Sequence, residues 1–467
     1  MIDSDVIAKL PKVEIHDHLD GGLRPATIIE LAEKVDHQLP TTDAQELEQW
    51  FYDAANSGDL PTYLTTFDHT TAVMQTKDAL VRVTREAVED LGADNVCYAE
   101  LRYAPEQHLA GGLSLQEVVE ATVQGAKEGE RVVQEKGGRI HARLILCAMR
   151  HADRATEIAQ LTVDNFGENS PGEGYVVGFD IAGAEDGFPA SNHSEAFDLL
   201  RRNLVPFTAH AGEAAGVDSI RDALAQGARR LGHGVRIYED FEATMSGVEL
   251  GEVARVVRDQ RIPLEICPTS NTQTGVCDDV ADHPFNLLYD MGFMCTVNTD
   301  NRLVSGTTMT REFTALAEAF DLEYWQLLEF TTNALEVAFC PAPLRSELEQ
   351  YIIFPAYAEL GGDLTSDIDG IDHVEGDPSL FADDESEGAR LSGGLNALHR
   401  GKGPVAGKMG GADHEQIELS MENLKHELEQ LGLSLDDDDA DDGVTNDEDS
   451  NGEDDAKGGA DPSGGAK

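Results

Sequence analysis

Eight short apolar segments, separated by stretches of helix-forming composition, constrain the fold of this chain more than any other feature. Each has the length of a strand and is bounded by polar or turn-forming residues. Eight strands alternating with helices over roughly 350 residues favour a closed parallel barrel over an open doubly wound sheet. We therefore predict an α/β protein with a (β/α)₈ TIM-type barrel, whose chemistry lies at the carboxyl ends of the strands. The predicted strands span residues 13–18, 96–103, 142–149, 175–181, 204–210, 229–235, 262–267 and 293–298.

The connection after the first strand, residues 19–95, is too long for a single crossover helix. Its middle, ELEQWFYDAANSGDLPTYLTTFDHTTAVM, has the composition of two or three additional helices. Because this connection leaves the catalytic face of the barrel, we predict that the extra helices form a lid. Ordinary crossover helices are predicted at residues 115–136 and 214–228.

The composition changes near residue 355, and we assign residues 1–355 to the barrel domain. Residues 356–467 are rich in Gly, Asp, Ser and Glu, and this composition predicts an acidic, mostly disordered tail. One short helix is predicted within the tail at residues 417–431, either docked on the barrel or on a partner, or only marginally stable. Its apolar residues follow a 4-3-4-3 spacing: Ile417, Met421, Leu424, Leu428 and Leu431.

The formal net charge of −55 is extreme, and it argues against nucleic acid or an anionic membrane as partner, since both would be repelled. Residues 361–467 contribute about −22 of this charge and residues 1–360 about −33, so the predicted barrel is itself acidic. An acidic, lysine-poor surface resembles the proteins of salt-accumulating halophiles, in which high salt screens self-repulsion. An acidic mesophilic enzyme is the alternative.

The chain contains no run of about 20 apolar residues and opens with no charged and apolar leader, so we expect it in the cytoplasm. Its six cysteines are scattered, most of them in apolar runs, and none forms a CxxC pair. This pattern indicates reduced core thiols rather than disulfides or a cysteine zinc site. The sequence leaves the oligomeric state open.

Two histidines, His16 and His18, stand one residue apart at the end of the first predicted strand, in VEIHDHLDGGLRP. Because side chains alternate faces along a strand, both point to the same side. An HxH pair alone is a weak indication of a metal site, but other candidate groups fall at further predicted strand ends. These are His210 and Glu213 in TAHAGE, His233 in LGHGV, and Asp300 and Asn301 in VNTDN. Imidazole nitrogen and carboxylate oxygen are ligands that zinc accepts.

Seven motifs, in this order, resemble those of the zinc-dependent adenosine deaminases of the amidohydrolase superfamily. They are HDHLDGGLRP, YAELRYAP, VVGFDIAGAE, TAHAGE, LGHGV, CPTSN and NTDN, spread over residues 11–340. The resemblance implies a (β/α)₈ barrel that binds one Zn²⁺ per chain through His16, His18, His210 and Asp300. It also implies an enzyme of purine salvage that acts on a small-molecule purine nucleoside. The enzyme would hydrolyse adenosine to inosine and ammonia, and 2′-deoxyadenosine to deoxyinosine and ammonia.

The same resemblance implies a role for each catalytic position. Zinc lowers the pKa of water to roughly 7, and the hydroxide so supplied would attack C6 of the purine. Glu213 matches the residue that protonates N1, whereas His233 and Asp300 match the residues that orient and deprotonate the water. A glutamate three residues past a ligand, at a strand end, also stands where a proton donor is needed.

Several further positions match the family's contacts to substrate. His18 and Asp20 match residues that face the ribose 5′-hydroxyl, and Gly183 matches a backbone donor to N3. Asn301 departs from the family pattern, because many members carry a second aspartate at this contact to N7. Three residues of the predicted lid match positions that form the apolar wall of the lid in the family: Tyr63, Leu64 and Phe67.

Two other functions stay open. A related barrel aminohydrolase acting on adenine or on a modified adenine nucleoside would share these motifs, although Asp20, in HLDG where we expect HLEG in the adenine branch, favours the nucleoside. AMP is disfavoured because no basic cluster for phosphate is present. A zinc-stabilised binding protein without turnover is disfavoured because every metal and catalytic position is intact. The cytidine-deaminase type is excluded because its H-x-E and P-C-x-x-C signature is absent.

Overall fold

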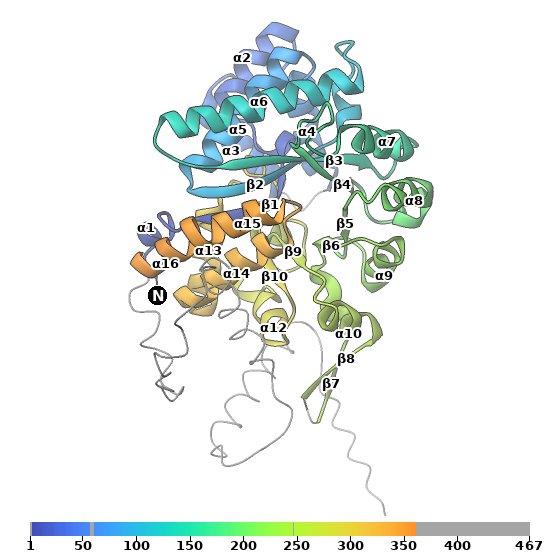
Figure 1. Cartoon of the computed structure of the whole chain (residues 1–467), viewed down its shortest axis with the longest axis vertical. Coiled ribbons are helices and arrows are strands. Elements are labelled where there is room, and N and C mark those ends of the chain that lie inside the picture. Colours follow the sequence, from blue (N-terminus) through green and yellow to red (C-terminus); the bar gives the residue numbers. More distant parts are fainter. Residues whose placement is uncertain (1, 57–59, 246, 361–467) are drawn as a thin grey trace, which may run out of the picture.

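Eight parallel strands alternating with helices form a barrel (Figure 1), so the predicted fold class is confirmed. The structure is a computed structural model, and it describes residues 2–56, 60–245 and 247–360. Each barrel strand overlaps one of the eight predicted segments. The barrel strands are β1 (Lys12–His18), β2 (Val96–Tyr103), β3 (His141–Met149), β4 (Val176–Ala182), β5 (Thr208–Ala211), β6 (Arg230–His233), β9 (Leu264–Ile266) and β10 (Cys295–Val297).

The strands pair as two parallel halves, in the orders β1-β2-β3-β4 and β10-β9-β6-β5. One isolated bridge joins β4 to the residue before β5, and a second joins Asp17 of β1 to Asp300, just beyond β10. At this second seam the Asp300 N–H donates to the His16 carbonyl oxygen at 2.8 Å, and the His18 N–H donates to the Asp300 carbonyl oxygen at 2.7 Å. Closure of the barrel therefore brings three of the predicted ligands together.

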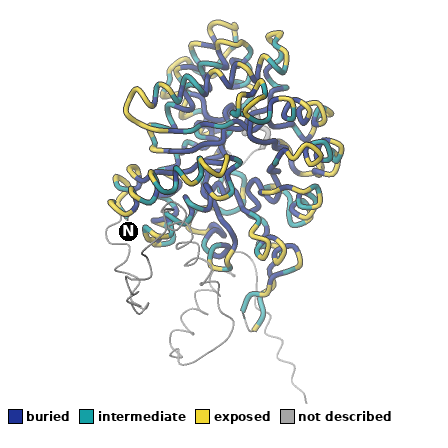
Figure 2. The backbone as a smooth tube through the Cα atoms, in the orientation of Figure 1, coloured by how far each residue is buried: buried dark blue, intermediate teal, exposed yellow. Residues whose placement is uncertain are grey.

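The barrel strands are buried on both faces, as the dark inner trace in Figure 2 shows, but their interior is not wholly apolar. Arg102 on β2 donates to Asp180 at 2.9 Å and to Glu265 at 2.8 Å. Arg230 on β6 donates to Glu100 at 2.8 Å and forms an ion pair with Glu265, with 2.6 Å between Nε and the carboxylate oxygen. Because an unpaired buried charge costs several kcal/mol, these five side chains are tolerated only as one mutually paired network.

Helices cover the outside of the barrel, with their exposed faces toward solvent (Figure 2). The predicted helices 115–136 and 214–228 correspond to α6 (Leu115–Glu135) and α9 (Val217–Gln226). Helix α6 begins with a capping box, in which Ser114 and Glu117 satisfy each other's backbone N–H groups. The covering helices are α5 (Lys77–Ala93), α6 (Leu115–Glu135), α7 (Ala155–Asn165), α8 (Ser194–Arg202), α9 (Val217–Gln226), α10 (Glu252–Asp259), α12 (Phe285–Asp290), α13 (Met309–Phe320) and α14 (Tyr324–Val337).

The long first connection contains three helices besides α5, and they confirm the predicted insertion. They are α2 (Pro25–Val35), α3 (Ala44–Ala55) and α4 (Leu60–Val73), which pack on one another (Figure 1). Helix α4 also packs on the short 3₁₀ segment Leu19–Gly21 that follows β1. The insertion thus lies beside the carboxyl end of the first strand, where the lid was predicted.

An antiparallel hairpin between β6 and α10 was not predicted. It consists of β7 (Phe241–Thr244) and β8 (Gly247–Leu250) and projects from the barrel (Figure 1). The segment is short and half exposed, so it lacks the apolar run that identified the barrel strands. The remaining helices are α1 (Ser4–Ile7), α11 (Pro268–Gln273), α15 (Ala342–Leu348), a π-helical segment (Glu349–Ile353) and α16 (Phe354–Leu360).

The proposed domain boundary at residue 355 falls inside α16. Tyr357 of this helix is buried and its hydroxyl lies 2.9 Å from that of Thr331 on α14, so the packed chain continues to Leu360. Residues 361–467, with the helix predicted at 417–431, lie outside the described residues. All six cysteines are free and five are buried, as predicted. None of the described helices has the length and apolar content to cross a bilayer.

We predict that Arg102→Met lowers the free energy of unfolding by about 3–5 kcal/mol, because it leaves Asp180 and Glu265 with one cation fewer in a buried site. Arg131→Met is the matched control, since Arg131 pairs with Glu135 on the exposed face of α6, and it should change stability by less than about 1 kcal/mol. Urea unfolding of the purified variants measures both values. Equal effects of the two substitutions would contradict a structural role for the network.

Candidate active site

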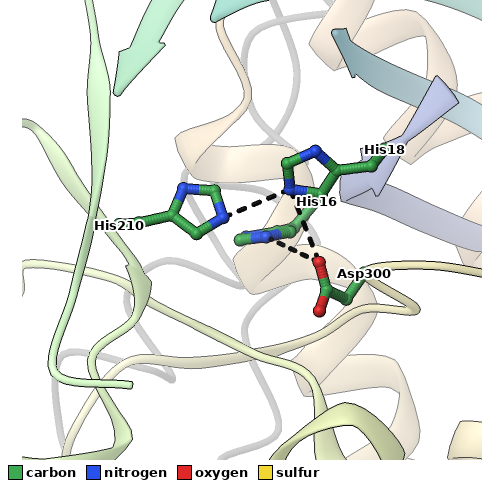
Figure 3. Close-up of side chains that lie close together, drawn as sticks. All are labelled: His16, His18, His210 and Asp300. Carbon is green, nitrogen blue, oxygen red and sulfur yellow. Dashed lines mark hydrogen bonds and ion pairs between the residues drawn. The ribbon is translucent and has the colours of Figure 1, made fainter. Parts of the chain in front are cut away.

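Four predicted metal ligands meet at the carboxyl end of the barrel. Their ligand atoms all lie within 4.8 Å of one another, and Figure 3 shows the four side chains converging, with His16 and His18 coming from the same strand. The His18 Nε2 atom lies 3.2 Å from His210 Nε2 and 3.5 Å from Asp300 Oδ1. His16 Nε2 lies 3.4 Å from the same Asp300 oxygen.

The outer nitrogens of two of these histidines are held by carboxylates. His16 Nδ1 lies 2.8 Å from Glu265, and His210 Nδ1 lies 3.0 Å from Asp180. Because an ionised carboxylate only accepts, each Nδ1 carries the proton and each Nε2 lone pair points into the cluster. His16 Nε2 is buried and makes no hydrogen bond within the described residues. Nitrogens of three imidazoles and oxygens of one carboxylate form a donor set that fits a zinc-like divalent ion.

The ionisation of the ligands also suits a cation. Burial lowers the pKa of His18 well below its usual value, so its ring is neutral. Burial acts to raise the pKa of Asp300, but the close approach of His16 and the neighbouring His233 and His18 outweigh it and hold that pKa well below its usual value. Neutral imidazoles and an ionised carboxylate are the forms that bind metal.

Asp300 and His233 share an unusual backbone conformation, with φ of 59° and 62°. A left-handed conformation costs a residue with a side chain roughly 1–2 kcal/mol, so the surroundings must hold it. The seam hydrogen bonds to β1 fix the Asp300 backbone, and the Ser270 hydroxyl donates to its Oδ2 at 2.6 Å. Such strain is found at functional sites.

The three predicted catalytic side chains form a second cluster, which shares Asp300 with the first. Polar atoms of Glu213, His233 and Asp300 lie within 4.8 Å of one another, and His233 Nε2 lies 3.6 Å from Glu213 Oε2. Burial, and next the charge of Asp300, raise the pKa of Glu213 to about 7. Burial lowers the pKa of His233 to about 4. At neutral pH the site therefore holds a carboxyl that can donate a proton beside an ionised carboxylate that can accept one.

Glu185, which lies within the motif VVGFDIAGAE but was not assigned a role, anchors the loop that carries Glu213. Its carboxylate accepts backbone N–H bonds of 2.6–3.0 Å from Gly212, Glu213, Ala214 and Ala215, and one of 2.5 Å from the Ser219 hydroxyl. Burial opposes its ionisation, but these donors lower the pKa of Glu185. A carboxylate thus fills the concave turn after β5 and fixes the backbone of Glu213.

The structure brings three of the predicted substrate contacts to the same end of the barrel. Asp20 is buried in the segment after β1, and burial raises its pKa to about 7. Gly183 follows β4 with φ of 95°, a conformation that glycine adopts without strain. Asn301 is buried against Gly21. A Cβ atom added to Gly21 would lie only 2.0 Å from the Asn301 Oδ1 atom, so the two residues are in close contact.

The lid residues are only partly described. Tyr63 and Leu64 lie on α4, but their side chains are outside the described part of the structure. Phe67, on the same helix, is partly buried and packs against the barrel core. Its contact with a substrate stays a prediction.

A sequence model of the adenosine deaminase family matches residues 11–354. The chain belongs to the adenosine deaminase family. It is 54% identical over 359 residues to adenosine deaminase 1 of Streptomyces coelicolor, covering 76% of this chain and 89% of that protein. It is 51% identical over 359 residues to the adenosine deaminase of Mycolicibacterium gilvum, covering 76% of this chain and 98% of that protein.

Solved structures of more distant proteins share the fold. An adenine deaminase from Arthrobacter aurescens has 25% identity and a TM-score of 0.63, over 75% of this chain and 98% of its own. The N6-mAMP deaminase of Arabidopsis has 26% identity and a TM-score of 0.63, over 74% of this chain and 98% of its own. The predicted membership of this amidohydrolase family is thus confirmed.

We predict that Glu185→Gln lowers kcat for deamination about 10²-fold, because one amide NH₂ would face backbone N–H donors and displace Glu213. Metal content should not change, since the hydrogen bonds that Glu185 accepts come from the backbone of residues 212–215 and from Ser219, and not from the four candidate ligand side chains. Glu195→Gln, on the exposed surface of α8, is the control for the charge change. Steady-state kinetics and metal analysis distinguish the outcomes, and a wild-type kcat would show that the loop holds Glu213 without this carboxylate.

Proposed function

We propose that this chain hydrolyses adenosine, and 2′-deoxyadenosine, to inosine or its deoxy form and ammonia. One observation carries the proposal: a cluster of three histidines and Asp300 that fits a metal ion shares its aspartate with a proton donor, Glu213. Relatives about 50% identical over three quarters of the chain are named adenosine deaminases, which supports this substrate.

We propose one zinc ion per chain, held by His16, His18, His210 and Asp300. Zinc bound there would lower the pKa of water to about 7 and so supply the nucleophile at neutral pH. The carboxylates Glu265 and Asp180 would keep the ligand lone pairs of His16 and His210 directed inward. The proximity of four ligand atoms supports the choice, and so does the absence of thiolate ligands among them.

Glu213 would protonate N1 of the purine, which breaks the aromatic system and makes C6 electrophilic. His233 and Asp300 would orient the attacking water and remove its proton. The water oxygen would bond to C6, and its first proton would leave with the amino group as ammonia when the C6–N6 bond breaks. Its second proton would return to Glu213, which restores the carboxyl and leaves a carbonyl at C6. The raised pKa of Glu213 supports this order, because burial lets the carboxyl keep a proton near pH 7.

The nucleoside would be held by groups at three strand ends. Asp20 and His18 would contact the ribose 5′-hydroxyl, the backbone N–H of Gly183 would donate to N3, and the Asn301 amide would donate to N7. The lid residues Tyr63, Leu64 and Phe67 would cover the apolar part of the substrate.

A related aminohydrolase acting on adenine or a modified adenine nucleoside is the alternative. Solved neighbours that carry such names, an adenine deaminase and an N6-mAMP deaminase, match this chain at only 25–26% identity. We therefore favour adenosine, and rate measurements on adenosine, 2′-deoxyadenosine and adenine decide between them. We also infer a cytoplasmic enzyme of purine salvage. Because the chain is strongly acidic, we infer that it has no nucleic-acid or anionic-membrane partner.

The test of the proposal is removal and return of the metal. Chelation should abolish ammonia release from adenosine and stoichiometric zinc should restore it, because four ligands hold the ion that supplies the nucleophile. Glu213→Gln separates binding from chemistry: it should retain zinc and lose on the order of 10²-fold or more in kcat, since proton donation to N1 is removed. Full turnover by a preparation shown to be metal-free would sink the mechanism.

Asn301 gives a prediction on pH. The asparagine NH₂ donates at every pH, whereas an aspartate donates to N7 only when protonated. Asn301→Asp should therefore keep most activity at low pH and lose it as pH rises through the pKa of the new carboxyl, which adds a descending limb to the profile. Replacing N7 by CH in 7-deazaadenosine should cost the wild-type enzyme roughly 1–3 kcal/mol in kcat/KM. Equal use of the two substrates by the wild type would show that Asn301 does not contact N7.

The acidic barrel further suggests a salt-adapted enzyme. Molar KCl should raise the activity or the thermal unfolding temperature, because screening relieves repulsion among surface carboxylates. Thermal melts and initial rates across a KCl series measure this, with choline chloride as a control for the cation. Highest stability at low salt would identify a merely acidic mesophilic protein.

A further inference from the structure

His233 lies at the inner end of a buried chain of hydrogen bonds that the reaction described above does not use. Asn271 Nδ2 lies 3.2 Å from His233 Nδ1, and Asn271 Oδ1 lies 3.2 Å from His283 Nε2. The chain ends at the backbone N–H of Phe285, 3.0 Å from His283 Nδ1. All four residues are buried, so solvent does not compete for these groups.

The direction of every bond in this chain follows from its last member. A backbone N–H can only donate, so His283 Nδ1 accepts. Burial lowers the pKa of His283 to about 3, so the ring is neutral and its single proton is on Nε2. Asn271 must then accept with Oδ1 and donate with Nδ2, because the reverse orientation would bring two donors together. His233 Nδ1 accepts that bond, which leaves the His233 proton on Nε2.

The barrel end thus contains histidines of two opposite kinds. His16 and His210 meet carboxylates at Nδ1, so their Nε2 atoms are bare and can bind a metal. His233 meets an amide donor at Nδ1, so its Nε2 carries a proton. This difference explains why His233, whose ring centroid lies 4.8 Å from that of His16, belongs to the catalytic cluster and not to the metal ligands.

We propose that His283 and Asn271 are positioning residues that hold His233 with its proton on Nε2. His233 then donates a hydrogen bond to the attacking oxygen, and Asp300 alone accepts the proton of the water. This assignment rests on the proposed function. There His233 and Asp300 together orient the water and remove its proton, whereas here each residue has one of these two roles. It also places His283, an unassigned histidine outside the metal cluster, in support of the reaction.

The decisive variant is Asn271→Asp, which keeps the shape of the side chain but replaces its donor with an acceptor. His233 would then carry a proton on Nδ1, and its neutral form would present a bare Nε2 to the site. We expect kcat for adenosine to fall about 10- to 100-fold, as for other residues that orient groups around a metal. KM and zinc content should stay near their wild-type values, because Asn271 is not among the proposed substrate contacts or metal ligands. Asn165→Asp, a buried isosteric change on α7 where Asn165 bonds Gln116, should leave kcat unchanged.

Two substitutions of His283 test the outer link. His283→Gln carries one acceptor and one amide donor, so it can accept from Phe285 and donate to Asn271, and it should keep most of kcat. His283→Phe keeps an aromatic ring at this position but removes both hydrogen bonds, and it should lower kcat as Asn271→Asp does. If both variants are folded and zinc-loaded but lose kcat equally, His283 does not position His233 through its hydrogen bonds.

The tautomer itself is measured by nitrogen NMR of the full-length, zinc-loaded enzyme labelled with ¹⁵N-histidine. The His233 signals, assigned by their loss in His233→Gln, should show a protonated Nε2 and a bare Nδ1 in the wild type, and a protonated Nδ1 in Asn271→Asp. A proton on Nδ1 in the wild type, or wild-type kcat in folded Asn271→Asp, would overturn the proposal. Absence of ammonia release by the wild type would instead contradict the proposed function, and the NMR measurement is independent of that result.

Discussion

The pairing of Asp300 with the first strand is the contact on which the site depends. Two backbone hydrogen bonds join residues about 280 positions apart in sequence, and they set the Asp300 carboxylate beside the imidazoles of His16 and His18. The buried Glu14 reinforces this seam, because its carboxylate accepts from the His16 N–H and from both the N–H and the hydroxyl of Thr299. Barrel closure and assembly of the site are therefore the same event.

The barrel interior connects this seam to the rest of the fold through charge. Glu265 pairs with Arg102, Arg230 and His16, and Asp180 pairs with Arg102 and His210. The acceptors that orient two candidate metal ligands are therefore also the anions that neutralise the buried arginines. Removing any one of these groups would disturb both packing and ligand orientation, since each buried charge is compensated by the others.

Sequence reasoning found the strands and the candidate ligands because both follow from local pattern. Apolar runs marked the eight strands, and alternation along a strand put His16 and His18 on one face. The partners of those ligands could not be found in this way. Glu265 and Asp180 each stand alone within an apolar strand, and only the closed barrel shows which histidine each one meets. The one sequence signal for these partners was an acidic residue inside an otherwise apolar strand, which indicates a buried carboxylate that needs a partner.

Residues that act by holding a neighbouring group were not predicted from the sequence, for the same reason. Glu185, Asn271 and Ser270 all stand inside motifs that were recognised, but their function lies in which backbone or ring they contact. The β7–β8 hairpin was missed because half of it faces solvent. The tail predicted at 356–467 is described only as far as Leu360, so its composition still supports only a prediction.

The seam has a consequence for how the protein is made. During synthesis His16 and His18 leave the ribosome long before Asp300 exists, and His210 follows between them. A nascent chain therefore exposes an incomplete set of metal-binding groups for most of its elongation, with both histidines of the first strand lacking their carboxylate. Contacts between the ends of a chain form slowly, because a long loop must close first. Assembly of the candidate metal site is thus tied to the final stage of folding, and a chain that stalls before residue 300 can fold neither the last seam nor the complete site.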